Sequence, residues 1–263
     1  MFEPRLALAS LSGESDAEWA RAAESDAGCA FLGGIALDDA TREAAREMVD
    51  RDRSEFLPDD PVAFVDDQLA ALADADLRAG FNVRTTSLDP LRETAAVCAD
   101  HGAILEVNAH CRQEEMCAVG AGETLLADTG ELTEQVRTAS DAGAAVSVKV
   151  RTEVPGVNLS ATARAIERAG ADCIHVDAMD SEHVVRDVRE ACDLFVVANN
   201  EVRDRESVFE YLGNGADAVS VGRPSDDPRV LRRVRDGLAA WADQERPPDD
   251  LERDHLAREE ATR

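Results

Sequence analysis

Polar residues that could take part in chemistry stand where short apolar runs of the sequence end. They are Asn108, Lys149, Arg151, Asn199, Asn200, Gly222 and Arg223. An arginine fork together with backbone amides is a common phosphate-binding arrangement. We therefore expect Arg223, with the amides near Asn200 and after Gly222, to form a phosphate site.

Lys149 is the only lysine in a chain that holds 28 lysine and arginine residues together. It lies between valines in "AVSVKV", where the period of a strand points it inward. A lysine ammonium is a compact point charge that the planar fork of arginine cannot replace. The retention of this one lysine favours a functional role. A Schiff-base amine, as in an aldolase-like enzyme, is one alternative for it.

The order of the elements predicts how these residues come together. Apolar runs alternate with amphipathic helical segments such as 89–102, 159–170 and 205–215. The runs cover residues 5–10, 29–34, 80–85, 103–108, 145–150, 173–178, 194–199 and 218–223. Eight such alternations predict an α/β fold, a single-domain (β/α)8 TIM barrel, whose active site lies at the carboxyl ends of its strands. An open doubly wound sheet is the alternative.

Two segments depart from a regular alternation. Residues 51–78 insert an extra helix between the second and third strands, and residues 109–127 form a long loop after the fourth. Loops of this length are usually functional. We assign 1–240 to the barrel and 241–263 to an acidic C-terminal tail.

The net charge of −27 is spread over nearly every segment. Such an acidic surface is typical of a halophilic protein and offers no cationic track for nucleic acid. The sequence has no run long enough to span a membrane and no signal peptide, so we expect a cytoplasmic protein. The six cysteines show no metal-ligand spacing, and we predict no metal site.

The segment "EVNAHCRQEEMCAVGAGETLL", followed by "VSVKVR", "AGADCIHVDA", "VVANNEV" and "GADAVSVGRP", resembles the flavin-dependent tRNA-dihydrouridine synthases. It is similar more loosely to other FMN-binding barrels, such as dihydroorotate dehydrogenases. The resemblance covers residues 79–240 and implies a TIM barrel with FMN as its cofactor.

The resemblance also implies roles for individual residues. Lys149 would stabilise the reduced flavin, Cys111 would be the proton donor, and Asn108 would hold polar groups of the ring or substrate. His110 is a further acid, base or substrate contact. The remaining cofactor-binding candidates are Asn82, Arg151, His175, Asp177, Asn199, Asn200, Gly222 and Arg223.

The chain departs from the family pattern at several positions. Arg112 replaces a proline, Glu114 and Glu115 replace lysines, and Asp177 stands where a flavin-contacting histidine is usual, with His175 two residues earlier. The family has a flavin-contacting glutamine on the third strand that has no clean counterpart here, and Asn82 or Arg84 would take its place. The residues after the barrel are too few for the helical RNA-docking domain of the synthases. We therefore expect a small pyrimidine-type substrate rather than tRNA.

These observations favour an FMN-dependent oxidoreductase that reduces or oxidises a C=C bond of a pyrimidine-like ring. The alternative is a non-redox barrel that binds a phosphate ligand or has a regulatory role. The oligomeric state is open.

Overall fold

Within residues 1–245, which the computed structural model describes, eight parallel strands form a closed barrel in the order β1 to β8. The strands are β1 Leu6–Leu8, β2 Cys29–Ala36, β3 Arg78–Arg84, β4 Ile104–Ala109, β5 Ala145–Arg151, β6 Cys173–Asp177, β7 Phe195–Asn199 and β8 Ala218–Val221. Pairing of Leu6 with Val219 and of Leu8 with Val221 closes β8 on β1. The predicted (β/α)8 barrel is confirmed.

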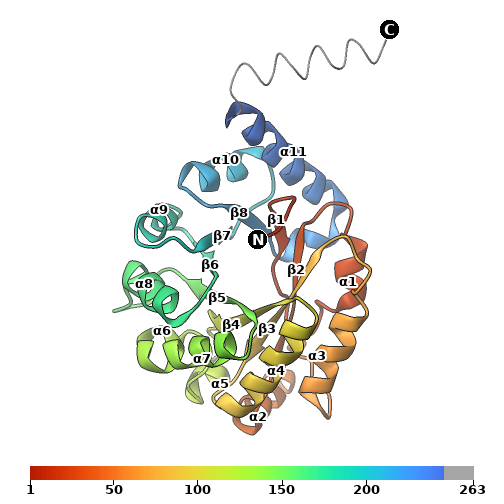
Figure 1. The fold of residues 1–263 in the computed structure, drawn as a ribbon, viewed down its shortest axis with the longest axis vertical. Helices are drawn as coiled ribbons and strands as arrows, with labels where there is room; N and C mark the ends of the chain where they lie inside the picture. Colours follow the sequence, from red (N-terminus) through yellow and green to blue (C-terminus); the bar gives the residue numbers. More distant parts are fainter. Residues whose placement is uncertain (246–263) are drawn as a thin grey trace.

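Helices surround the barrel, as Figure 1 shows. They are α1 Ala17–Ala22, α2 Asp39–Val49, α3 Pro61–Ala70, α4 Leu88–Asp100, α5 Glu114–Ala118, α6 Thr124–Ala127, α7 Thr129–Asp141, α8 Leu159–Ala169, α9 Val184–Arg189, α10 Arg205–Gly213 and α11 Pro228–Glu245, with a 3-10 helix over Arg223–Asp226. Several begin at a side chain that accepts backbone N–H groups, such as Asp38, Asp60 and Asn158. The predicted boundary at residue 240 falls inside α11, and residues 246–263 of the predicted tail lie outside the described part.

Two helices, α2 and α3, separate β2 from β3, so the predicted extra helix is present. Helix α3 occupies the place of a regular barrel helix because it packs against α4, and its Gln68 accepts the Ala17 N–H of α1 at 2.8 Å. Helix α2 instead packs against α5, in the segment after β4. The predicted long loop at 109–127 thus contains the short helices α5 and α6, and α2 supports it.

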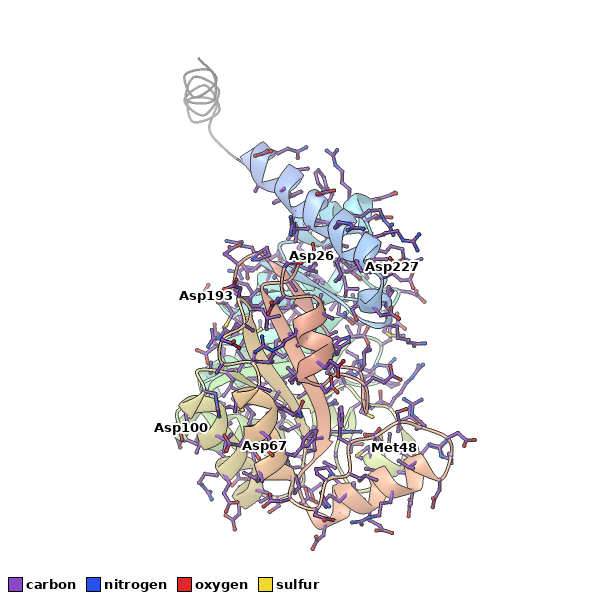
Figure 2. The ribbon with its side chains drawn as sticks, turned by 90° about the vertical axis from the view of Figure 1, so that its right-hand side faces the viewer. Asp26, Met48, Asp67, Asp100, Asp193 and Asp227 are labelled. Carbon is purple, nitrogen blue, oxygen red and sulfur yellow. The ribbon has the colours of Figure 1, made fainter. Side chains whose placement is uncertain are left out.

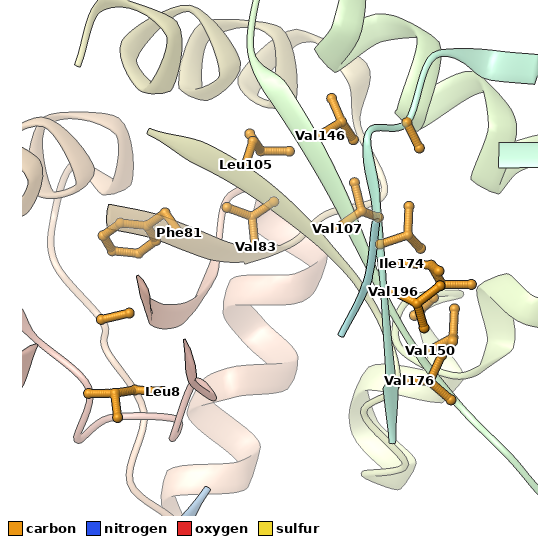
Figure 3. Close-up of a cluster of buried hydrophobic side chains, with 14 of the residues drawn as sticks. Leu8, Phe81, Val83, Leu105, Val107, Val146, Val150, Ile174, Val176 and Val196 are labelled. Atoms are coloured by element: carbon orange, nitrogen blue, oxygen red, sulfur yellow. The ribbon is translucent and has the colours of Figure 1, made fainter. Parts of the chain in front are cut away.

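The apolar core lies mainly between the strands and the helices. Outward-facing strand residues, among them Leu105, Val107 and Val176, are fully or almost fully buried against the helical layer (Figure 3). A second apolar cluster, including Phe31, Ile104 and Val197, fills the interior at the amino ends of the strands. Above it, toward the carboxyl ends, the interior is lined by polar side chains. This polar half is where a barrel places its active site.

Acidic side chains cover the outside of the molecule. Figure 2 labels Asp67, Asp100 and Asp193, which are exposed on the periphery. Among the residues that the structure describes, no helix is long and apolar enough to cross a membrane.

Candidate active site

The strand register brings the predicted residues of β4 to β7 to one end of the barrel. Asn108 pairs with Lys149 across β4 and β5, and Arg151 pairs with Asp177 across β5 and β6. Asp177 in turn pairs with Asn199 of β7. Residues that lie far apart in the sequence therefore meet at the carboxyl ends of adjacent strands.

Lys149 is 3% exposed and, within residues 1–245, has no hydrogen-bond or ion-pair partner. Its charge lies close enough to Asp177 and Glu106 to help lower the pKa of both carboxyls, although it forms an ion pair with neither. A charged group on a largely buried side chain is more stable with an acceptor beside it, and residues 1–245 supply none here. The site therefore fits a ligand that presents electronegative atoms to Lys149.

Asn108 organises the start of the loop that carries Cys111. Its Oδ1 accepts the backbone N–H groups of His110 at 3.1 Å and of Cys111 at 2.9 Å. The Cys111 carbonyl accepts the Glu123 N–H at 2.8 Å, which ties the far end of the loop to its beginning. Gly122 makes this close approach possible, since a Cβ there would lie 2.2 Å from the Cys111 oxygen.

Arg84 lies beside Cys111 and is 1% exposed. It forms a buried ion pair with Glu55 of the α2–α3 connection and donates to the Gly34 carbonyl at 2.7 Å. Burial opposes its charge, but Glu55, and to a lesser degree Cys111, raise the pKa of Arg84 above its usual value. Its buried Nε has no hydrogen-bond partner within the described chain. The thiol therefore faces a fixed positive charge.

His110 and Asp177 form a hydrogen-bonded pair at the rim, with His110 Nε2 2.7 Å from Asp177 Oδ2. Burial lowers the pKa of His110 more than Asp177 raises it, so the imidazole is neutral at pH 7. Burial also acts to raise the pKa of Asp177, but the hydrogen bond from His110 holds it below its usual range. The pair places a neutral imidazole at the mouth of the barrel, one residue before Cys111 in the chain.

Below the rim, a chain of buried polar side chains meets at Glu106. Its carboxylate accepts from Asn82 at 2.8 Å, from Ser147 at 3.2 Å and from His175 Nδ1 at 2.8 Å. Burial raises the pKa of Glu106, but His175 and then Lys149 outweigh this effect, and the net shift is downward. Burial lowers the pKa of His175. The centre of the barrel thus holds a carboxylate and a neutral imidazole.

His175 is fully buried, and both its ring nitrogens are engaged, because Nε2 lies 2.7 Å from Ser220 Oγ. It occupies the layer beneath Asp177. Asn82 is also fully buried, and it accepts from Asn108 Nδ2 at 2.9 Å. Arg151 is 8% exposed and pairs with Glu123 at 3.1 Å, while its Nε is buried without a partner among residues 1–245. These residues support the mouth of the barrel from within and from one side.

The predicted phosphate residues lie at the ends of β7 and β8. Asn199 donates to the Ser220 carbonyl at 3.0 Å, and Asn200 donates to the Met179 carbonyl at 2.7 Å from a backbone with φ of 103°. A Cβ built at Gly222 would meet no atom within 4 Å. The side chain of Arg223 is exposed and, among the described residues, has no ion pair or hydrogen bond. The open space beside Gly222 and the unpaired guanidinium suit an anionic group.

Glu106, Glu55 and Ser220 were not among the site residues predicted from the sequence. Glu106 carried a readable signal, because it is an acid in the middle of the apolar run "AILEVN". A charge inside a buried strand requires a partner. Glu55 and Ser220 gave no comparable signal, since serines and loop acids are common.

Comparisons with known proteins identify the family. The sequence model of the dihydrouridine synthase (Dus) family matches residues 81–259, which is more than half of the chain. The chain belongs to the dihydrouridine synthase family. The match begins in β3 and includes every strand from β4 to β8, so it contains all the predicted site residues, from Asn82 to Arg223.

Two curated proteins are distant relatives of this Dus family member. An uncharacterised protein of Methanocaldococcus jannaschii is 26% identical over 234 residues, covering 84% of this chain and 89% of the relative. The catalytic subunit of dihydroorotate dehydrogenase B (NAD(+)) of Shouchella clausii is 23% identical over 212 residues and 68% of each chain. The family and the barrel are those of FMN-type oxidoreductases.

Solved structures share the fold at low sequence identity. A tryptophan synthase complex from Pyrococcus furiosus matches with a TM-score of 0.58 and 15% identity, over 91% of this chain and 100% of the other. The 3-hexulose-6-phosphate synthase of Salmonella typhimurium matches with a TM-score of 0.55 and 18% identity, over 90% and 99%. These likenesses show the barrel alone.

Proposed function

We propose that this Dus family member is an FMN-dependent oxidoreductase that reduces or oxidises a C=C bond of a small pyrimidine-like substrate. The observation that carries the proposal is Lys149 at the mouth of the barrel, a lysine only 3% exposed whose ammonium has no hydrogen-bond or ion-pair partner among the described residues. It would hold the electronegative edge of the flavin, and Arg223 with the space at Gly222 would hold the phosphate. When bound, the flavin supplies or accepts a hydride.

Cys111 supplies the second half of the chemistry in this proposal. In the reducing direction, the thiol of Cys111 would give its proton to the carbon next to the one that gains the hydride. In oxidation both transfers reverse. Arg84 lies beside Cys111, so its guanidinium faces the sulfur atom. The neutral imidazole of His110 at the rim would be a further acid, base or substrate contact.

A small substrate fits the surface of this chain better than tRNA does. The loop after Cys111 presents Glu114 to solvent and pairs Glu115 with Arg51. The net charge of −27 repels a polyanion, whereas it exerts little force on a neutral ring. A cytoplasmic location remains part of this proposal.

The first test is the absorption spectrum of the protein purified in high salt, with extraction and mass measurement of any yellow ligand. We expect stoichiometric FMN, which Lys149→Ala and Arg223→Ala lose. Arg137→Ala, an exposed arginine on α7, should retain it. A colourless protein that does not bind added FMN would overturn the redox proposal and favour a non-redox phosphate-binding barrel.

With flavin present, Cys111→Ala tests the acid. It should keep the flavin spectrum but lose about 100-fold or more in turnover of uracil- or dihydrouracil-type compounds, the usual contribution of a general acid. Unchanged turnover would remove Cys111 from the mechanism.

A further inference from the structure

The hydrogen bonds that connect the Cys111 loop to Glu106 run in a fixed direction, because the groups at the loop end of this series can only donate. The backbone N–H groups of His110 and Cys111 can only donate, so Asn108 must present its Oδ1 to them. Asn108 Nδ2 then faces Asn82 at 2.9 Å, and Asn82 must present its own Oδ1. The Asn82 amide nitrogen consequently donates to Glu106.

A second branch reaches Glu106 from the opposite side of the barrel. Asn199 Nδ2 donates to Ser220 Oγ at 2.8 Å, and the Ser220 hydroxyl lies 2.7 Å from His175 Nε2. With the imidazole neutral, Ser220 donates to Nε2, and the ring proton on Nδ1 is directed at Glu106. Both branches therefore end on the same carboxylate, which can only accept.

We infer that Glu106 is a positioning residue that sets the orientation of the Asn108 amide at the barrel mouth through Asn82, and that fixes the tautomer of His175 on the other branch. Glu106 is fully buried, so the carboxylate acts through these partners rather than on a ligand. Its effect on the loop of Cys111 is independent of the proposed function. Its consequence for turnover rests on that function.

The inference makes a specific prediction for Glu106→Gln, which has nearly the same shape but replaces one acceptor oxygen by a donor NH2. If the new NH2 faces Asn82, then Asn82 and Asn108 must both turn over, and two backbone N–H groups lose their acceptor. If it faces His175, the imidazole must move its proton from Nδ1 to Nε2. In either case, the hydrogen bonds of one branch must reverse their direction.

A charge-conserving exchange should undo this reversal. In Glu106→Gln with Asn82→Asp, the oxygen of the introduced amide accepts from Ser147 and His175, and its nitrogen donates to the new carboxylate at position 82. That carboxylate still accepts from Asn108 Nδ2. Asn82→Asp alone places two carboxylates in contact and should damage the protein.

The experiment measures both branches at pH 7, without reference to activity. Hydrogen–deuterium exchange reports the His110 and Cys111 amides, and nitrogen NMR of the labelled histidines, of which the chain has five, reports the His175 tautomer. We expect Glu106→Gln either to raise exchange at the two amides about tenfold, as for a lost hydrogen bond, or to change the tautomer. The charge-conserving variant should restore both. Ser147→Ala removes one donor to Glu106 without reversing any other hydrogen bond. It should leave both the amide exchange and the His175 tautomer unchanged.

Three results would overturn the inference. The first is a folded Glu106→Gln protein with native amide protection and the native tautomer. The second is failure of the charge-conserving variant to restore them, or to fold. The third is a Ser147→Ala protein that loses protection as Glu106→Gln does, since that would indicate general loosening of the barrel. If Glu106→Gln alone does not fold, a folded double variant with protected amides still supports the inference.

The catalytic consequence has a separate readout. Where FMN binds, Glu106→Gln should lower kcat more than it raises KM. Absence of flavin or turnover would contradict the proposed function while leaving the amide and tautomer results to decide the role of Glu106.

Discussion

At the scale of single residues, the site depends on which groups are charged, and His110 offers a direct test of this. Its pKa is lowered in the folded protein, so the unfolded chain binds more protons as the pH falls below about 6.5. The free energy of unfolding should therefore decrease between pH 7.5 and 5. In His110→Gln this decrease should be smaller by up to about 1.4 kcal/mol per pH unit, the limit for one proton.

Urea unfolding at constant salt across this pH range measures the difference. The lowered pKa of Asp177 does not interfere, because its stabilising contribution is lost only at lower pH, below the carboxyl's usual value of about 3.9. His183→Gln, which removes an exposed histidine beside α9, serves as the control. Equal pH dependence in His110→Gln and the unaltered protein would contradict the assigned charge state.

At the scale of elements, apolar periodicity predicted all eight strands and the extra helix between β2 and β3. The rest could not be predicted because it depends on contacts between distant segments. No local pattern shows that α2 packs beneath the Cys111 loop, or that Glu55 reaches Arg84 of β3. The ends of the apolar runs indicated the residues that lie at the mouth of the barrel. The polar layer beneath them could not be predicted, because it depends on which residues of four strands point inward at the same level.

The closure of the Cys111 loop gives a prediction at this scale. Gly122 has φ of 63° and no room for a Cβ, whereas Gly120 has φ of 89° with open space around it. Gly120→Ala should cost about 1–2 kcal/mol for its backbone conformation alone. Gly122→Ala should cost about 1–3 kcal/mol more, because its methyl group meets the Cys111 carbonyl.

Chemical denaturation of the two glycine variants compares these costs, and alkylation of Cys111 in a Cys117→Ser background reports the loop itself. The other cysteines are buried, so they contribute little to the alkylation rate. We expect the rate to change in Gly122→Ala only. Similar stability and similar alkylation in both variants would show that Gly122 does not hold the loop closed.

At the scale of the whole molecule, the net charge of −27 predicts a stability that rises with salt. Two like charges 10 Å apart in water repel by about 0.4 kcal/mol, and many such pairs on this surface add up to a few kcal/mol. Raising monovalent salt from about 0.1 to 1 M shortens the screening length from about 10 to 3 Å, which removes most of this repulsion. The buried ion pair of Arg84 and Glu55 is screened much less, so the core should not lose stability in return.

The measurement is the free energy of unfolding as a function of NaCl concentration, repeated for a variant with Asp67, Asp100 and Asp193 changed to asparagine. Asp67 and Asp100 are exposed on the neighbouring helices α3 and α4, and Asp193 is exposed just before β7 (Figure 2). Their removal therefore lowers the repulsion without changing a residue at the mouth of the barrel. The variant should be more stable at low salt and gain less from added salt. If stability instead fell with salt in the unaltered protein, attraction within surface ion pairs such as Arg51 with Glu115 would outweigh the net repulsion. The balance between these two terms decides whether the acidic surface destabilises the barrel in dilute buffer or is already compensated by local pairing.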